Sequence, residues 1–193
     1  HENHEYVDLG LSVKWATANI GENKPEKSGD YFAWGETSPK SNYDWSTYLW
    51  CKHSDNMLES LTKYNTQSDL GAVDKLTTLN LSDDAAKQNW GGDWRMPTAK
   101  EMYELLTQCD WEATATGYEV ISRVNGKSIF LPAGGCMDKT SIFKPGEYGY
   151  YWSSGLVEND AKNAHVLYFN AKDKYDSSIS RSTGCFIRPV CPK

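Results

Sequence analysis

The sequence of 193 residues lacks any long hydrophobic run. No stretch approaches the roughly 18 apolar residues that a membrane-spanning helix requires, and no signal-peptide core is visible. The chain begins at His1 rather than Met, so we interpret it as a mature or trimmed segment whose targeting signal is missing. The length suits one domain, and we predict a single domain over residues 1–193.

The sequence also lacks an excess of basic residues. The formal net charge is −6, and no stripe of Lys and Arg appears. Proteins that bind nucleic acid use such stripes to neutralise phosphates. We therefore expect no nucleic-acid partner.

Cysteine is scarce and irregularly spaced. The five positions are Cys51, Cys109, Cys136, Cys185 and Cys191. No CxxC pair is present, which argues against a zinc site. An odd count leaves at least one thiol free or paired outside the chain. Cys185 and Cys191 cannot pair in an extended segment, because six strand residues span ~20 Å.

Aromatic residues are abundant, with eight Trp and twelve Tyr. Such residues either fill a core or form a flat binding platform, and in a domain of this size most must be core. Near the N-terminus, apolar residues occupy alternate positions from Val7 to Trp15, which predicts a half-buried strand or strand pair. Residues 21–56 have no sustained period and are interpreted as irregular connections.

Three helices are predicted. A short one is expected around Met57–Tyr64. Ser82 and the acidic residues after it start a second helix that Gly91 and Gly92 end. The third covers Ala99–Cys109, because Thr98 and Glu101 have the spacing of a capping box. Its apolar residues form one stripe: Met102, Leu105, Leu106 and Cys109.

The second half of the chain is rich in predicted strands. Tyr118–Val124 and Lys127–Leu131 flank Asn125-Gly126, which favours a hairpin with a type I′ turn. Three further strands are expected at Tyr148–Ser154, His165–Asn170 and Gly184–Val190. The segments Gly155–Ala164 and Ala171–Thr183 are interpreted as polar loops. Helices followed by a run of strands indicate an α+β fold.

No catalytic motif is found, so we expect no enzyme. His1 and His4 are three residues apart, whereas a zinc protease needs its two histidines at i and i+4. Ser153 and Ser154 lack the flanking glycines of a nucleophile elbow. His165 is the nearest candidate base, with no orienting acid identifiable from the sequence.

A metal or cofactor is not expected either. The Glu-Pro-Asn, Gln-Pro-Asp and Trp-Asn-Asp signatures of calcium-dependent lectins are absent. Glu158 and Asp160, with Asn159 and Asn163, are weak candidates for calcium ligands. Such a cluster is more often a solvated acidic loop than a calcium site.

Several ordered phrases resemble a known family. They are residues 5–17, 29–37, 89–98, 128–134, 149–154 and the terminal Ile187-Arg188-Pro189-Val190. Together they cover almost the whole chain and resemble the Fibrobacter succinogenes major paralogous domain, which is abundant in secreted and surface proteins of Bacteroides-type bacteria. The Arg-x-Pro-Thr phrase and closing strand also look like the C-terminal domain of Legionella collagen-like adhesins and, more distantly, the formylglycine-generating (sulfatase-modifying) fold.

The resemblance implies a C-type lectin-like fold. Two helices would flank small antiparallel sheets with long irregular loops, the termini would lie close together, and late loops and strands would form the ligand face. Members often carry cysteines where Ala18 and the phrase Lys63-Tyr64-Asn65 stand here, so family disulfides do not transfer. In lectin-like folds a helix often bonds to the last strand, which implies Cys109 with Cys191 or Cys185.

The segment Glu158–Ser182 is dense in Tyr, Asn and Ser, the residue types of antibody paratopes. Together with the resemblance, this composition predicts a secreted or cell-surface adhesin that binds a glycan or a host or bacterial surface protein. The expected ligand face comprises Tyr168, Asn170, Tyr175, Ser177, Ser178, Ser180 and Arg181, supported by Tyr150 and Trp152. Such residue types also arise in targets of diversity-generating retroelements.

Two other interpretations stay open. The chain could be a structural tip or stalk domain of a surface assembly. A formylglycine-generating oxidase would need a reactive cysteine pair, which Cys185 and Cys191 do not supply by spacing. Arg95 and Arg188 stand beside apolar residues and are interpreted as structural, paired with carboxylates such as Asp93 or Glu101.

Overall fold

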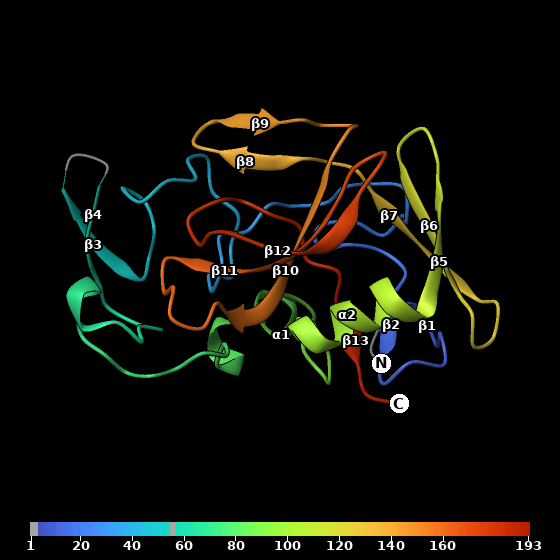
Figure 1. The fold of residues 1–193 in the computed structure, drawn as a ribbon, viewed down its shortest axis with the longest axis horizontal. Coiled ribbons are helices and arrows are strands. Elements are labelled where there is room, and N and C mark those ends of the chain that lie inside the picture. The colour runs from blue at the N-terminus through green and yellow to red at the C-terminus, as the bar shows by residue number, and fades with distance from the viewer. Residues whose placement is uncertain (1–3, 55–56) are drawn as a thin grey trace.

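The computed structural model describes residues 4–54 and 57–193. In this part of the chain two short α-helices accompany five small antiparallel sheets joined by long irregular connections (Figure 1). Two 3₁₀ turns, at Ser68–Leu70 and Leu81–Asp83, lie in the long connection before the first α-helix. The prediction of an α+β fold, with a few helices and several small antiparallel sheets, is confirmed.

The two ends of the chain meet in one sheet. Its strands β1 (Tyr6–Val7), β2 (Lys14–Ala16) and β13 (Val190–Cys191) lie in the order β1-β2-β13, so the termini are close together (Figure 1). The predicted strand pair is confirmed. The alternating Leu9 and Leu11 lie in the turn between β1 and β2, where both are buried in the core.

Two predicted helices are confirmed. Helix α1 spans Ala85–Trp90, and its Asp84 cap accepts a hydrogen bond from Lys87 N–H. Helix α2 spans Ala99–Gln108 and begins with the complete capping box of Thr98 and Glu101. Met102 and Leu105 are buried on its inner face, as the apolar stripe predicted.

The helix expected at Met57–Tyr64 is wrong. Met57–Leu61 is instead strand β4, which pairs with β3 (Cys51–Ser54) in a two-stranded hairpin. The expected helix had no capping residue or long apolar stripe to favour it over this local pairing. Residues 55 and 56 lie outside the described part.

A three-stranded meander follows α2. It consists of β5 (Cys109–Ala113), β6 (Gly117–Ser122) and β7 (Ser128–Pro132). The predicted hairpin is confirmed, but its type I′ turn is wrong. Only Gly126 has a positive φ, 73°, and its N–H bonds to the Ser122 carbonyl across a longer turn.

The largest sheet holds β10 (Gly149–Leu156), β11 (Asn163–Phe169) and β12 (Lys174–Ser180) in that order. The first two agree with predicted strands. Strand β12 lies where a polar loop was expected, and that prediction is wrong: β12 pairs with β11 along its whole length. As an edge strand it is largely exposed, so its residues need no apolar alternation.

The predicted strand Gly184–Val190 is only partly regular. Cys185 pairs with Phe32, and Phe186 pairs with Tyr151, as isolated bridges. Residue Val190 enters β13 and bonds to Arg95. A small hairpin, β8 (Cys136–Asp138) with β9 (Ser141–Phe143), lies beside this segment.

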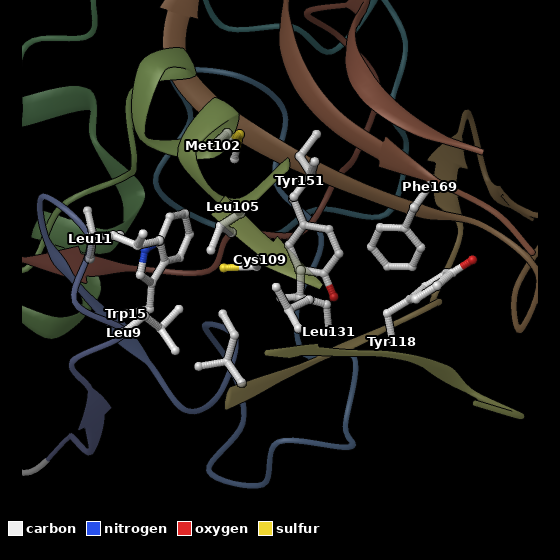
Figure 2. Close-up of a cluster of buried hydrophobic side chains, with 14 of the residues drawn as sticks. Leu9, Leu11, Trp15, Met102, Leu105, Cys109, Tyr118, Leu131, Tyr151 and Phe169 are labelled. Carbon is white, nitrogen blue, oxygen red and sulfur yellow. The ribbon is translucent and has the colours of Figure 1, made fainter. Parts of the chain in front are cut away.

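The β10–β11–β12 sheet separates two hydrophobic clusters. On one face Tyr151, Leu167 and Phe169 pack in the cluster that contains Met102 and Leu105 of α2 (Figure 2). On the other face the second cluster contains Trp152 and Val166. Because one sheet contributes to both clusters, the described chain forms a continuous packed body.

Arg95 and Arg188, which lie in two of the phrases that carry the family resemblance, have structural roles, as predicted. Arg95 makes a bidentate pair with Glu101, with N–O distances of 2.8 and 2.6 Å. Arg188 is fully buried and donates to Asn19 Oδ1 and to the carbonyls of Ala16 and Phe130 rather than to the expected carboxylate. Burial lowers the pKa of Arg188 to about 10.

Candidate ligand-binding surface

Three tyrosines lie side by side across the largest sheet. Tyr150 pairs with Tyr168, and Tyr168 pairs with Tyr175, so strand register alone places all three on one face. Their ring centroids are 5.2 and 4.9 Å apart. We call Tyr150, Tyr168 and Tyr175 the tyrosine row.

The members of the tyrosine row differ in exposure, and the central Tyr168 is the most buried. Tyr168 is 8% exposed and Tyr150 is partly buried, whereas Tyr175 on the edge strand is 49% exposed. Two further aromatic rings extend the row: Tyr148 lies 5.6 Å from Tyr168, and Phe143 lies 5.9 Å from Tyr148. Phe143 is 48% exposed, so aromatic side chains reach solvent at both ends.

Burial keeps two phenols of the tyrosine row neutral, those of Tyr150 and Tyr168. Burial raises the pKa of Tyr150 well above its ordinary range, and it also raises the pKa of Tyr168. Tyr168 Oη accepts a hydrogen bond from the Asn170 side-chain amide. The row therefore offers aromatic faces and, at Tyr150 and Tyr168, uncharged hydroxyl groups at physiological pH.

A groove adjoins the aromatic residues. It has a volume of about 420 Å³, and Tyr118, Tyr148 and Phe169 contribute its aromatic lining. Glu147 and Lys172 are exposed at its rim, so the charged groups there have opposite signs. The volume falls within the range of small-molecule sites. Tyr148 thus belongs both to the groove and to the extended aromatic row.

Asn170 shapes the groove rather than pointing freely into it. Its side-chain oxygen accepts from the N–H groups of Lys172 and Asp173, both at 2.8 Å, which fixes the turn between β11 and β12. Its carbonyl accepts from the Tyr118 hydroxyl at 2.8 Å. The predicted ligand residue Asn170 lines the groove, but its oxygen atoms already have partners within the protein.

Two predicted residues of the ligand face are inaccessible. Trp152 is fully buried, and its indole N–H donates to the Phe32 carbonyl at 2.7 Å. Trp152 therefore packs in the second hydrophobic cluster and is not available to contact a ligand. Arg181 is also 0% exposed, so its prediction as a ligand contact is wrong.

Arg181 is instead the centre of a buried network. Its guanidinium donates to the Tyr48 hydroxyl at 2.9 Å and to the carbonyls of Tyr64 and Ala161 at 2.9 and 3.0 Å. The Trp34 ring lies beneath it, with 5.1 Å from Cζ to the ring centroid. We call Arg181 and these partners the Arg181 centre.

The predicted serines divide between the two faces of β12. Ser177 pairs with Val166, which in turn pairs with Trp152. Because Val166 is two residues from Tyr168 on the same strand, all of these residues lie on the face that carries the tyrosine row. Ser178 pairs with His165 and Ser180 with Asn163, so both point to the opposite face. The structure therefore groups Ser177 with the tyrosine row and separates Ser178 and Ser180 from it.

The candidate base His165 has an acidic neighbour after all. Asp176 Oδ2 lies 3.2 Å from His165 Nδ1, so the structure supplies an acidic neighbour that could not be identified from the sequence. Ser153 is fully buried, and its hydroxyl accepts from Gly155 N–H at 3.1 Å. An attacking hydroxyl must reach its substrate, and the Ser153 hydroxyl is enclosed by the fold.

The calcium candidates gain no further ligands from the fold. Asp160 Oδ2 accepts from the Asn163 side-chain amide at 2.7 Å. Within residues 4–54 and 57–193, no three His, Cys, Asp or Glu side chains form a metal-binding group. The structure therefore adds no support for Glu158 and Asp160 as metal ligands.

The disulfide implied by the lectin-like resemblance is wrong for this structure. All five cysteines lie in the described part and carry unpaired thiols. Cys109, Cys185 and Cys191 belong to three different hydrophobic clusters, so Cys109 does not face either of its expected partners.

Sequence reasoning missed Tyr148 as a site residue, although the aromatic run from Tyr148 to Trp152 was visible. The groove was not predictable, because Tyr118 and Phe169 come from strands about fifty residues apart. No helix of the described chain is long and apolar enough to cross a membrane. No family model, curated protein or solved structure matches the chain.

Proposed function

We propose that this chain is a non-enzymatic binding module, which recognises a glycan, or a sugar-bearing surface protein, through the tyrosine row and the adjoining groove. One observation carries the proposal: an in-register tyrosine row leads across a sheet to Tyr148, which also lines a groove of about 420 Å³. The sugar-bearing ligand would lie against the exposed aromatic residues and extend into the groove.

The chemistry of the surface favours a neutral ligand with rings. Tyrosine supplies a large contact area at low conformational cost and a hydroxyl for hydrogen bonding. The phenols of Tyr150 and Tyr168 are uncharged, and Glu147 and Lys172 at the rim carry opposite charges. A sugar has apolar C–H faces that pack on aromatic rings and hydroxyls that bond to neutral groups, so it matches both features.

The wider assignment follows from the sequence phrases. We propose membership of the Fibrobacter succinogenes major paralogous domain family, a C-type lectin-like fold and a secreted or cell-surface location. Two features support the fold: the termini share the β1-β2-β13 sheet, and the two helices accompany small antiparallel sheets. The proposed recognition uses no metal.

Direct screening tests the proposed function. The labelled domain is applied to an array of defined glycans, mucins and matrix proteins, with calcium and then with a chelator. We expect a discrete set of glycan hits that survives the chelator. Hits lost with the chelator would instead support a calcium site at Glu158 and Asp160, and hits restricted to sugar-free proteins would overturn the glycan assignment.

A matched pair of variants locates the binding surface. Tyr148→Ala with Tyr175→Ala removes one partly buried ring and one exposed ring from the extended row, whereas Tyr103→Ala removes a 59% exposed tyrosine from α2. We expect the double variant to lose the hits and Tyr103→Ala to retain them. Equal retention by both variants would place the binding surface elsewhere.

Assembly is the second candidate function. Strand β12 is the edge of its sheet, and Ile142 and Phe143 of β9 are about half exposed, at 50% and 48%. Exposed edges and apolar side chains are typical of surfaces that pair with another chain. Analytical ultracentrifugation tests this candidate: concentration-dependent association that Phe143→Asp abolishes would favour assembly over glycan binding.

A further inference from the structure

Two of the five cysteines belong to neighbouring strands. Cys136 begins β8, and Cys185 lies in the extended segment that runs beside it. The residues next to them, Met137 and Gly184, form an antiparallel bridge and exchange both backbone hydrogen bonds, at 2.8 and 2.9 Å.

This bridge fixes how the cysteines face each other. In an antiparallel ladder, the pair next to a doubly hydrogen-bonded pair has no hydrogen bonds between its members. Cys136 and Cys185 occupy that position. The N–H and carbonyl of Cys185 accordingly bond to Phe32 on the other side, at 3.0 and 2.9 Å. Side chains of such a pair point to the same face of the ladder.

The spacing of such a pair suits a disulfide. Residues in a non-hydrogen-bonded antiparallel pair have Cα atoms about 4.5 Å apart, within the range of about 4.4–6.8 Å that disulfides span. Cys136 is 6% exposed and Cys185 is 0% exposed, and both belong to the same hydrophobic cluster. Both thiols therefore lie on one side of the ladder.

We propose that Cys136 and Cys185 form a cross-strand disulfide when the chain folds under oxidising conditions. The thiols in this structure are the reduced form of that pair. The bond would join β8 to the segment that pairs with Phe32, and so would link three segments that contribute to the second hydrophobic cluster.

The remaining cysteines do not compete for this bond. Cys109 lies in the first hydrophobic cluster and Cys191 in a third, beside Trp94. Cys51 lies at the edge of the clusters, with its thiol directed to the Trp45 carbonyl at 3.3 Å. An odd number of cysteines is thus consistent with one bond and three thiols.

Oxidised glutathione is a sufficient oxidant. The Cys136 thiolate attacks one glutathione sulfur and releases a glutathione thiolate; the Cys185 thiolate then attacks the mixed disulfide and releases the second. Two cysteine thiols lose two electrons and two protons, and one glutathione disulfide becomes two glutathione thiols. Either cysteine can make the first attack.

Burial determines when the reaction occurs. It raises the pKa of Cys136 to about 11 and that of Cys185 well above its ordinary value, so few thiolates exist in the folded state. The bond forms while the chain is still open. The same burial separates this pair from the exposed reactive cysteines that a formylglycine-generating oxidase requires.

Mass spectrometry tests the pairing in the unmodified chain. Denatured, reduced protein is refolded in a mixture of reduced and oxidised glutathione. The refolded sample is then unfolded in denaturant with an excess of iodoacetamide, so that buried thiols are alkylated, and is digested with chymotrypsin, which cuts after Phe186 and so separates Cys185 from Cys191. We expect one linked peptide pair, Cys136 with Cys185, and alkylated Cys51, Cys109 and Cys191.

Two results would overturn the proposal. One is alkylation of both Cys136 and Cys185 in protein whose circular dichroism shows it to be folded. The other is a bond from either residue to a different cysteine. As a second measurement, the oxidised wild-type protein should melt several degrees higher than the same sample after reduction, because the bond closes a long loop. Cys136→Ser with Cys185→Ser should show no such difference.

Discussion

The two ends of strand β12 have opposite roles. At its start, Tyr175 is 49% exposed and completes the tyrosine row. Just beyond its end, Arg181 is 0% exposed and holds three distant segments together. Both residues stand in the same polar stretch of sequence. The difference shows that polarity alone does not distinguish a surface residue from the centre of a buried network.

Removing the Arg181 side chain should have the largest effect on folding. Arg181→Ala leaves the Tyr48 hydroxyl and the carbonyls of Tyr64 and Ala161 without their buried donor. We expect a loss of at least about 3 kcal/mol in the free energy of unfolding, measured by urea denaturation.

Arg123→Ala is the matched control for the buried arginine. Arg123 is about half exposed, and its Nε lies 3.5 Å from Asp110 Oδ1. An exposed ion pair of this kind contributes about 1 kcal/mol or less. Equal losses in the two variants would contradict the role given to the Arg181 centre.

Local signals in the sequence predicted α1 and α2, although the weaker pattern at Met57–Tyr64 led to a helix that is instead strand β4. The capping box of Thr98 and Glu101 and the stripe through Met102 and Leu105 are all encoded within a few residues. The Arg181 centre could not be predicted in this way, because Tyr48 lies 133 residues away in the chain. Its burial depends on how distant segments pack, which no local pattern records.

Strand β12 and its tyrosine row were only half predictable. Tyr168 and Tyr175 were recognised as surface candidates by composition, but β12 itself was interpreted as a loop. An exposed edge strand shows no apolar alternation, and its pairing with β11 is a backbone interaction. Register then decided which residues share a face, and it separated Ser178 from Tyr175.

The second largest effect on stability is expected at Glu101, another buried charged residue that contrasts with the exposed tyrosine row. Burial would raise the pKa of Glu101, but the bonds from Arg95 and Thr98 outweigh it and hold the pKa below its usual value of 4.5. The stabilisation is therefore present above that value and is lost as the pH falls through the folded-state pKa.

Glu101→Gln should lower the free energy of unfolding by about 1–3 kcal/mol at pH 7. The variant should also lose less stability than the wild type as the pH falls from 5 to 3. Glu112→Gln changes an exposed carboxylate on β5 and serves as the control. Urea denaturation across this pH range checks both; parallel pH curves for wild type and Glu101→Gln would contradict the assignment.

The tyrosine row should contribute less to folding than either of these sites. Tyr175→Ala removes a ring from an exposed edge strand, so we expect a loss of about 1 kcal/mol or less, measured by urea denaturation. A loss of about 3 kcal/mol would show that Tyr175 is needed for folding, as Arg181 is, and would remove the distinction between the two ends of β12.

The smallest effect is expected on the opposite face of the same strand. Ser178 is exposed and pairs with His165, away from the tyrosine row. Ser178→Ala should change the free energy of unfolding by no more than about 0.5 kcal/mol. Its affinity for the array's glycan hits should stay within about twofold of the wild-type value. A large loss of binding would move the recognition surface to the other side of β12.

The most direct test of the account measures binding and folding in one variant. Titration calorimetry with the strongest soluble glycan hit compares wild type, Tyr175→Ala and Tyr103→Ala, after denaturation has established their stabilities. We predict that Tyr175→Ala weakens binding at least tenfold, about 1.4 kcal/mol, while its stability stays close to that of Tyr103→Ala. Unchanged affinity in a folded Tyr175→Ala protein would contradict the claim that the tyrosine row is the recognition surface.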